Sequence, residues 1–497
     1  MTAPRSREYL ERLVTRLRRL PTETEWVEFK TSMAKSEEIG QYISALANAA
    51  ALVGRSYAYA LWGIRDSDHE LVGTTFNPDT SKVGNENLEN WLLRLVHPQV
   101  NFRFHTLSLD GHRVVVLEIE AASHAPVRFK EAEYIRIGSY KKKLRDHPDH
   151  QKRLWKALEG TTFEQGIARD GVRDDEIVTL LDYPSYFDLT GTPLPENRSR
   201  ILATLESDGL VQRTEDEMWS VTNLGAALFA RRMSDFTSTS RKPLRVIQYR
   251  GDSRVETLRE QVGVRGYAAG FRGLIEYIMN LLPANEVIGT ALRKDLPLYP
   301  RLAIRELVAN AIIHQDLTQS GNGPTVEIFS SRIEITNPGI PLVEPERFVD
   351  APPRSRNESL ASMMRRIGVC EERGSGWDKI GFEIELHQLP APLVELPQGS
   401  TRVTLFSHKP LGEMDKAERI RAVYLHSCLR YVVRQQLTNS SLRERFGIAP
   451  QSSAQATRLI NEALDAGVIA PFDPQAAKKL MRYVPAWAVE EGRAAGI

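Results

Sequence analysis

Alternating and helix-spaced apolar positions divide the first 140 residues into short strands and helices. Trp26 to Lys30 and Tyr57 to Ile64 are typical of strands, and Glu37 to Ala50 carries apolar residues at helical spacing. The same patterns predict a helix at Leu88–Leu95 and strands at Asn101–Ser108, His112–Ile119 and Tyr134–Ile137. The first domain is therefore expected to be mixed α and β.

The rest of the chain shows three further patterns. Asp174 to Met233 is typical of two helices, two short strands and another helix, which predicts a small winged-helix-like connector. A second α and β domain follows, with helices at Gly266–Leu282 and Arg301–His314 and strands at Leu244–Tyr249, Pro324–Phe329, Arg332–Thr336 and Thr401–Ser407. Met414 to Trp487 then predicts helices, a short turn and a wing.

Length and composition agree with several folded domains. A chain of 497 residues exceeds what one hydrophobic core usually supports, and 41% hydrophobic with 26% charged residues is typical of folded proteins. We expect an α+β multidomain protein with domains at 1–160, 161–240, 241–410 and 411–497.

Charge and cysteine content restrict the function. The formal net charge is +1, so any nucleic-acid surface must be local. Cys370 and Cys428 are the two cysteines, which excludes a disulfide framework and a cysteine-based zinc site. The sequence shows neither a signal peptide nor a membrane-spanning stretch, and we expect a cytoplasmic protein without a membrane partner.

Acidic residues surround the first predicted strands. The segment PTETEWVEFK contains Glu23 and Glu28, and Asp66 follows the strand at Tyr57 to Ile64. Clustered carboxylates bind Mg²⁺ or Mn²⁺, which generate hydroxide and neutralise a phosphodiester. Taken by themselves, acidic residues near strand ends are more often solvated surface.

These segments resemble the Schlafen/AlbA family. The resemblance rests on TEWVEFK, on SALAN in the following helix, and on the strand that runs into GIRD, and it covers about 140 residues. In nuclease members it implies Glu23, Glu28 and Asp66 as metal ligands. Lys30 is then a candidate contact to the scissile phosphate, and Asp68 and Glu70 are alternatives to Asp66.

A basic stretch follows the last strand of this domain. Ser139 to Arg145 contains four cations beside a tyrosine, namely Lys141, Lys142, Lys143 and Arg145. Two interpretations are equally favoured, a phosphate-binding surface and a solvated loop that leads into a helix.

A second candidate site lies on the helix RLAIRELVANAIIHQD. Glu306, Asn310 and His314 recur every four residues, so they share one face. An amide oxygen can hold the Mg²⁺ that bridges phosphates, while a carboxylate one turn earlier orients water. In the later segment ERGSGWDKI, backbone amides at Gly374 and Gly376 can bind phosphate at a helix start.

These blocks, together with ITNPGIP, resemble the GHKL ATPases from about Leu244 to Ser407. The resemblance implies ATP as ligand, Glu306 as the water-orienting base, Asn310 as the Mg²⁺ ligand, and Asn337 and Gly339 near the adenine. Asn337 replaces the family's usual aspartate, so we expect nucleotide binding with slow hydrolysis.

The C-terminal pattern predicts a winged helix whose second helix exposes Arg458. DNA contact and protein contact are equally favoured for this module.

Two functions follow. The first is a nucleotide-regulated, metal-dependent endonuclease for structured, tRNA-like RNA, which by resemblance suits defence against phage. The second is a DNA-binding, ATP-binding transcriptional regulator without nuclease activity. In both cases we expect RNA or DNA as partner and a homo-oligomer.

Overall fold

The computed structural model describes residues 5–20, 22–31, 35–123, 125–160, 162–214, 218–282, 284–288, 293–321, 323–352, 354–370, 376–477 and 480–489. It divides into two compact units, Met1–Arg173 with Gln212–Ser220, and Asp174–Val211 with Val221–Ile497. The domain limits at residues 160, 240 and 410 stay predictions. Within the described part of the chain, no helix is long and apolar enough to cross a membrane.

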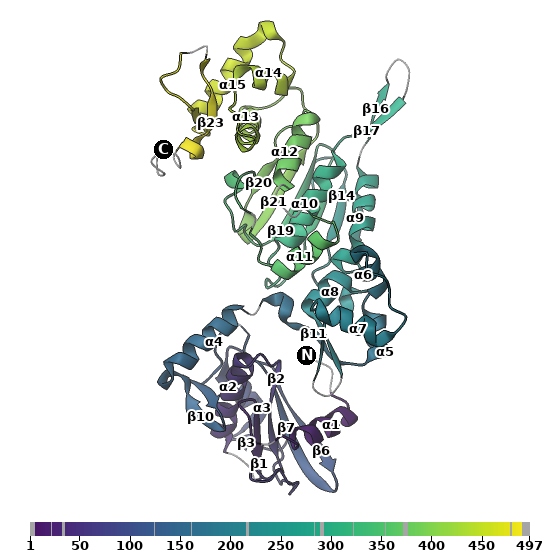
Figure 1. Cartoon of the computed structure of the whole chain (residues 1–497), viewed down its shortest axis with the longest axis vertical. Helices are drawn as coiled ribbons and strands as arrows, with labels where there is room; N and C mark the ends of the chain where they lie inside the picture. Colours follow the sequence, from purple (N-terminus) through teal and green to yellow (C-terminus); the bar gives the residue numbers. More distant parts are fainter. Residues whose placement is uncertain are drawn as a thin grey trace. The chain divides into compact units, whose positions relative to one another are not determined.

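Two four-stranded sheets lie in the first unit (Figure 1). In the first sheet, β1 (Val27–Lys30) pairs in parallel with β2 (Tyr57–Trp62), and β7 (His112–Glu120) and β6 (Phe102–Leu109) continue it antiparallel. The second sheet has the order β10 (Tyr140–Lys143), β9 (Ala132–Ile137), β8 (Arg128–Phe129) and β5 (Val96–His97). The remaining elements are α1 (Arg7–Leu17), β3 (Lys82–Val83), β4 (Glu86–Asn87), α3 (Leu88–Leu95) and α4 (Pro148–Gly160).

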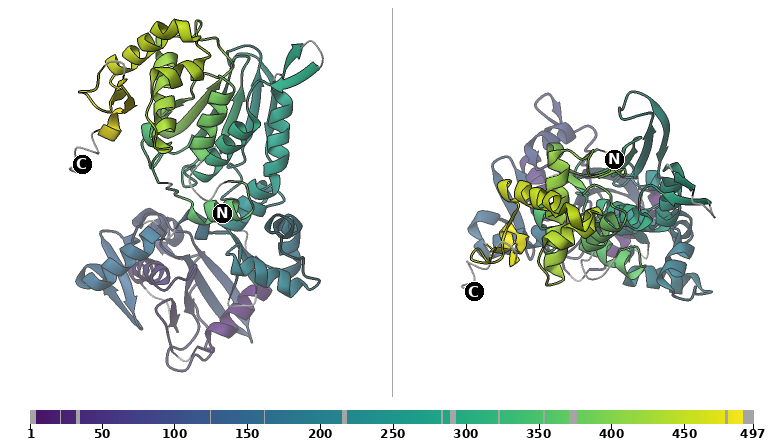
Figure 2. Two further views of the ribbon diagram at one scale, coloured as in Figure 1. Left: turned by 45° about the horizontal axis from the view of Figure 1, so that its top comes forward. Right: turned by 90° about the horizontal axis from the view of Figure 1, so that it is seen from above.

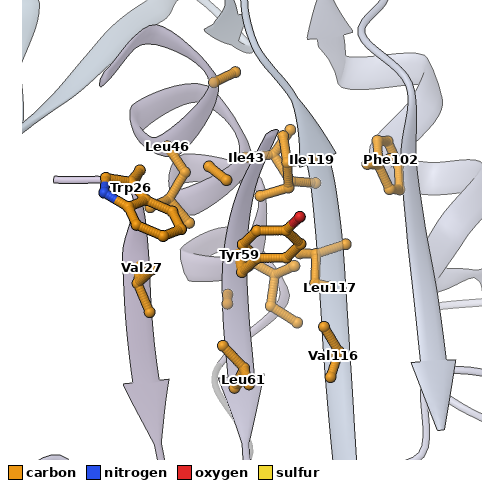
Figure 3. Close-up of a cluster of buried hydrophobic side chains, with 14 of the residues drawn as sticks. Trp26, Val27, Ile43, Leu46, Tyr59, Leu61, Phe102, Val116, Leu117 and Ile119 are labelled. Carbon is orange, nitrogen blue, oxygen red and sulfur yellow. The ribbon is translucent and has the colours of Figure 1, made fainter. Parts of the chain in front are cut away.

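Helix α2 (Ser36–Leu52) contacts both sheets and is buried along most of its length. Figure 3 shows its Ile43 and Leu46 against the side of the first sheet. Small residues allow close packing, and a Cβ on Gly40 would come within 2.2 Å of the Phe129 ring. Burial on two sides explains why this helix is rich in alanine.

Two polar residues of α2 fix the second sheet. Asn48 donates from Nδ2 to the carbonyls of Val127 and Tyr134, each at 2.8 Å, and accepts from the Val127 N–H at 2.7 Å. Ser44 donates to the Val127 carbonyl at 2.7 Å and accepts from the Tyr134 N–H at 3.0 Å. These bonds satisfy buried backbone groups, which gives the SALAN segment a structural role.

Short helices and a small sheet follow. The helices are α5 (Asp174–Leu180), α6 (Tyr183–Thr190), α7 (Arg198–Ser207) and α8 (Asn223–Phe229). The sheet has the order β11 (Ile167–Val172), β13 (Trp219–Thr222) and β12 (Val211–Arg213). The hairpin residues Gln212–Ser220 belong to the first unit, and the four helices belong to the second.

A six-stranded sheet forms the centre of the second unit. Its order is β15 (Thr257–Val262), β14 (Arg245–Tyr249), β18 (Thr325–Ile328), β19 (Arg332–Pro338), β21 (Ser400–Phe406) and β20 (Leu393–Glu395). Helices α9 (Tyr267–Leu281), α10 (Arg301–Ile313) and α12 (Gly376–Leu386) cover one face (Figures 1 and 2). The other elements are the hairpin of β16 (Ala284–Ile288) and β17 (Arg293–Pro297), and α11 (Glu358–Arg366).

The C-terminal segment has its own small core. Helices α13 (Lys416–Val432), α14 (Asn439–Phe446) and α15 (Ser453–Asp465) precede a hairpin of β22 (Ile469–Pro471) and β23 (Tyr483–Pro485). Val423, Leu442 and Leu459 pack together in this core. Capping boxes fix the starts of α13 and α14, with Asp415 and Thr438 as the N-cap residues.

Candidate functional site

Strand β1 places Glu28 and Lys30 on one face, because successive strand side chains alternate. Glu28 is buried, and its carboxylate pairs with the Lys30 ammonium group. Glu23 turns back toward the same strand, where its Oε1 accepts from the Phe29 N–H at 2.7 Å. The sequence-predicted residues Glu23, Glu28 and Lys30 thus lie in one cluster.

Arg136 of β9 occupies the centre of this cluster. Its side chain has no exposed surface and pairs with both Glu23, at 3.0 Å, and Glu28. Burial raises the pKa of Glu23, and the Phe29 N–H and the Arg136 charge oppose that shift. Burial also lowers the pKa of Arg136, against the effect of Glu23. Three buried charges are therefore held together by mutual pairing.

Asp66 lies in the turn after β2, where it is exposed. Its negative charge contributes to the raised pKa of Glu23, which places the two carboxylates near one another. The alternatives Asp68 and Glu70 both pair with Arg65, at 2.6 and 2.8 Å. Asp66 is thus the carboxylate of this turn whose charge acts on Glu23.

The donor set fits Mg²⁺ or Mn²⁺ poorly. Both buried carboxylates already accept hydrogen bonds or ion pairs from protein groups, namely Arg136, Lys30 and the Phe29 N–H. A divalent cation needs such oxygens as ligands and would lie beside the Arg136 guanidinium. Among the described residues, no group of three His, Cys, Asp or Glu side chains is arranged to hold a metal ion.

The basic stretch corrects one expectation. Instead of a solvated loop, residues Tyr140–Lys143 form β10, in which Lys141 lies opposite Arg136 of β9. The Lys141 ammonium group is 4.2 Å from the ring centre of Tyr42, and that of Lys30 is 5.5 Å from it. Burial lowers the pKa of Lys141, and the charges of Lys30 and Arg136 add to this shift.

We call Lys30, Tyr42 and Lys141 the tyrosine-centred cation cluster. Lys142 and Lys143 are exposed on the same strand as Lys141. Arg145 is also exposed, and its guanidinium is 3.5 Å from Asp146. The cluster and the exposed lysines form a local basic surface of the kind that contacts phosphates.

In the second unit, α10 aligns Glu306 and Asn310 toward the start of α12. A Cβ on Gly376, the first residue of α12, would lie 3.4 Å from Glu306 Oε2 and 3.8 Å from Asn310 Nδ2. Glu306 is buried. The Glu306 carboxylate and the Asn310 amide thus lie against the first residue of α12. Gly374 lies outside the described residues.

The end of β19 carries two further residues that the sequence predicted for nucleotide binding. Asn337 is buried, and its Nδ2 donates to the Pro338 carbonyl at 3.0 Å. Gly339 has a φ of +97°, and a Cβ there would come within 2.9 Å of Asp316 Cβ, so only glycine fits. Thr401 of β21 donates to the Gly339 carbonyl at 2.7 Å.

His314 and Arg356 lie near this glycine turn. Burial, with the charge of Arg356, lowers the pKa of His314 to about 4, so the imidazole is neutral at pH 7. A Cβ on Gly339 would be 3.4 Å from Arg356 Nη1. Arg356 thus lies beside the glycine turn of the candidate nucleotide site.

Arg458 lies on the exposed side of α15, 4.0 Å from Glu462. Thr457, its neighbour, accepts from Asn439 Nδ2 at 3.0 Å and is therefore engaged inside the C-terminal segment.

Comparison with known families matches two parts of the chain. Residues 23–145 match the family described as "Schlafen, AlbA_2". Residues 321–405 match the family described as "Putative ATP-dependent DNA helicase recG C-terminal". The chain therefore carries an N-terminal Schlafen/AlbA_2 domain, as expected, and an ATPase-like domain of the RecG C-terminal type. Asn337, Gly339 and Gly376 lie within the second match, and Glu306 and Asn310 precede it.

The solved structures that match this chain include two that differ in how much of it they cover. The DIP2311 protein from Corynebacterium diphtheriae is 17% identical, with 94% of this chain and 93% of that chain covered and a TM-score of 0.42. The N-terminal domain of a protein from Nitrosomonas europaea titled "Putative ATP-dependent DNA Helicase RecG-related Protein" is 19% identical, over 27% of this chain and 90% of that chain, with a TM-score of 0.20. Among curated proteins, none matches.

Sequence reasoning missed Arg136, Tyr42 and Thr401. Arg136 alternates with apolar residues in AEYIRI, a pattern that usually puts the charged residue in solvent. The one available signal was the position of this arginine among apolar residues, next to a segment that carries a run of lysines.

Proposed function

We propose that the protein is a nucleotide-binding regulator that binds nucleic acid without cutting it. The observation that carries this proposal is the pairing of Arg136 with both Glu23 and Glu28. Because the guanidinium already neutralises both carboxylates, they hold β1 and β9 together and are not available as metal ligands. The two matched families support a nucleotide-binding, nucleic-acid-associated protein.

The nucleic acid binds, in this proposal, along β10 and the end of β1. Lys30 and Lys141 are held over Tyr42, so less side-chain entropy is lost when a phosphate arrives. Lys142 and Lys143 extend the basic surface. The contacts are to phosphates, and they position the nucleic acid without specifying its sequence.

ATP binds between α10, the start of α12 and the end of β19, in a GHKL-type arrangement. Asn310 would hold the Mg²⁺ of the nucleotide, and Gly376, which lies against Glu306 and Asn310, would bring the start of α12 to the phosphates. When bound, the nucleotide supplies a triphosphate whose charge the helix start stabilises. Glu306 orients water, and Asn337 accepts from the adenine with a neutral oxygen. The missing charge at Asn337 favours weak binding and slow hydrolysis.

The regulatory part of the proposal concerns the helical segments. Helices α14 and α15 with the β22–β23 hairpin have the order of a winged helix, and Arg458 is placed to contact DNA or a partner. In the connector, α5, α6 and α7 precede β12 and β13, and α8 follows them, whereas the sequence predicted two helices before the strands. If the nucleotide binds one of two arrangements of these modules more tightly, its binding shifts the protein toward that arrangement. Cytoplasmic location and a homo-oligomer stay predictions.

Equilibrium binding tests this function directly. Labelled tRNA, single-stranded RNA and duplex DNA are titrated with the full chain in EDTA, and the titration is repeated with Mg²⁺ and ATP. We expect metal-independent binding whose dissociation constant changes when ATP is present. Absence of binding to all three nucleic acids contradicts the proposal.

A second candidate function is the metal-dependent endonuclease, which would act on tRNA-like RNA in defence against phage. The charge of Asp66 contributes to the raised pKa of Glu23, and this effect supports the endonuclease function. It requires Arg136 to release both carboxylates when metal arrives. Manganese binding, followed by electron paramagnetic resonance, tests this requirement. Binding in the wild type that is lost in Glu28→Gln and Asp66→Asn favours the nuclease, and equal signals from all three proteins exclude this site.

A further inference from the structure

Strand β10 carries an aromatic side chain that phosphate contacts do not use. Tyr140 is 69% exposed and begins this edge strand of the second sheet (Figure 1). Among the Phe, Trp and Tyr residues described in the first unit, Tyr140 and Trp155 are exposed, and the others are buried or half-buried. The Tyr140 ring therefore leaves apolar area in water that a flat, stacking partner would cover.

The hairpin that joins β9 and β10 sets the direction of this ring. Tyr140 lies opposite Ile137 across a two-residue turn, in which Gly138 has a φ of +59°. Because strand side chains alternate, Tyr140 shares a face with Lys142, while Lys141 lies on the other face. The Lys142 ammonium group is 5.7 Å from the ring centre of Tyr140. An aromatic ring and a cation are thus paired at the edge of the sheet.

The charges beside the Tyr140 ring favour an anionic partner. Lys142 and Lys143 are exposed, and neither forms an ion pair with another described residue. Carboxylates act on the two other cations of this segment, Glu38 on Lys141 and Asp146 on Arg145. Two lysines on the same strand as the ring can therefore contact phosphates.

We propose that Tyr140 stacks on an unpaired nucleobase, so that the surface of β10 selects single-stranded over duplex nucleic acid. The bases of a single strand can turn their faces outward onto an aromatic side chain, whereas those of a duplex stack on one another. Such stacking tolerates any sequence, because every base has a π-face. Lys142, beside the ring, contacts a phosphate next to the stacked base. The inference rests on the proposed function, which takes β10 as the nucleic-acid surface.

The test compares Tyr140→Ala, Tyr140→Phe and Trp155→Ala in the full chain. Tyr140→Phe keeps the ring, and Trp155→Ala removes the other exposed aromatic side chain, which lies on α4. Dissociation constants for labelled single-stranded DNA and duplex DNA are measured in EDTA from low to high salt. We expect Tyr140→Ala to bind single strands about tenfold more weakly and duplex as the wild type does. Its salt slope should stay unchanged, because no charge is lost.

Abasic DNA connects this loss of affinity with base stacking. A single strand of abasic sites keeps its phosphates and has no bases. When the normal strand is replaced by the abasic one, the wild type should lose about tenfold more affinity than Tyr140→Ala does. Tyr140→Phe and Trp155→Ala should behave as the wild type on all three DNAs. A purely structural role of Tyr140 would weaken the binding of normal and abasic strands equally.

Three results contradict the inference. In the first, Tyr140→Ala binds single strands with the wild-type affinity while Lys141→Ala binds more weakly, so stacking fails and the nucleic-acid function stands. In the second, Tyr140→Ala weakens the binding of normal single strands, abasic strands and duplex equally. In the third, the wild type binds none of the three DNAs, and the proposed function fails together with the inference.

Discussion

Two glutamates, Glu28 in the first unit and Glu306 in the second, have the same burial and different surroundings. Each is 2% exposed. Glu28 pairs with Arg136 and Lys30, whereas Glu306 faces Asn310 and the glycine that begins α12. A carboxylate between two cations is fixed as an ion pair, whereas one at the start of a helix lies where that helix can bind phosphates. The neighbours of a buried carboxylate, rather than its burial, indicate its role.

Removing the Arg136 side chain should cause the largest change, a loss of folding stability. Arg136→Met leaves Glu23 and Glu28 buried without their shared cation, so the free energy of unfolding should fall by about 3–5 kcal/mol. Urea denaturation measures this value. The exposed Arg145 serves as the matched control, and Arg145→Met should change little.

A double variant tests the same pairing of Arg136 with the two glutamates. Arg136→Met combined with Glu28→Gln removes one of the stranded charges and should recover part of the lost stability. If Arg136→Met costs less than about 1 kcal/mol, the guanidinium does not fix this cluster.

Adding a side chain at Gly376 should cause the next largest change, a loss of ATP affinity. A valine at this position would lie against Glu306 and Asn310, in the place proposed for the phosphates. We expect Gly376→Val to weaken ATP binding about 100-fold, or about 2.7 kcal/mol, in a calorimetric titration. Gly273→Val in α9 is the control, because a Cβ there meets no atom within 4 Å. Unchanged ATP affinity in Gly376→Val means that the nucleotide binds elsewhere.

Protonation of His314, which lies near the proposed nucleotide site, should lower the free energy of unfolding by a smaller amount. Its folded-state pKa of about 4 is below the ordinary value, so the unfolded chain takes up a proton first as the pH falls. Stability is therefore full above about pH 6.5 and falls toward pH 4, by about 1–2 kcal/mol between pH 7 and pH 5.

Urea denaturation at several pH values checks this slope. His314→Gln should flatten it, and the exposed His112→Gln should not. Burial also lowers the pKa of His105 in β6 to about 4, so the double variant with His105→Gln should show the flattest profile. An unchanged slope in His314→Gln contradicts the assignment.

Loss of one lysine should have the smallest effect. Lys141→Ala removes a cation that is held over Tyr42, so nucleic-acid affinity should fall by a few-fold and the salt slope by about 0.7–0.9. Fluorescence anisotropy at several salt concentrations measures both. Lys152→Ala, an exposed lysine of α4, should behave as the wild type, and equal losses in the two variants would mean a nonspecific charge effect.

Local patterns predicted the elements that carry the candidate sites. Strand β1 and helix α10 occur where the apolar spacing predicted them, and both are buried along most of their length. Strand β15 was not predicted, since all six of its side chains are exposed and no buried face leaves a pattern. For the segment of β10, which is short and carries three lysines, the sequence favoured a phosphate-binding surface and a solvated loop equally.

The contacts between distant segments were beyond the sequence. Arg136 is more than 100 positions from Glu23, and nothing local to either residue indicates their pairing. The role of Gly376 was expected from its place at a helix start, but its approach to Glu306 depends on how α10 and α12 pack. Side-chain identity gave the candidate chemistry, and tertiary packing decided which groups meet.

The most direct test follows the integrity of labelled tRNA, single-stranded RNA and duplex DNA during incubation with the full chain and Mn²⁺ or Mg²⁺, with and without ATP. Glu28→Gln and an EDTA arm serve as controls. The account predicts intact nucleic acids that remain bound in every arm, because Arg136 occupies the carboxylates. Metal-dependent cleavage by the wild type that is lost in Glu28→Gln contradicts it and establishes the nuclease.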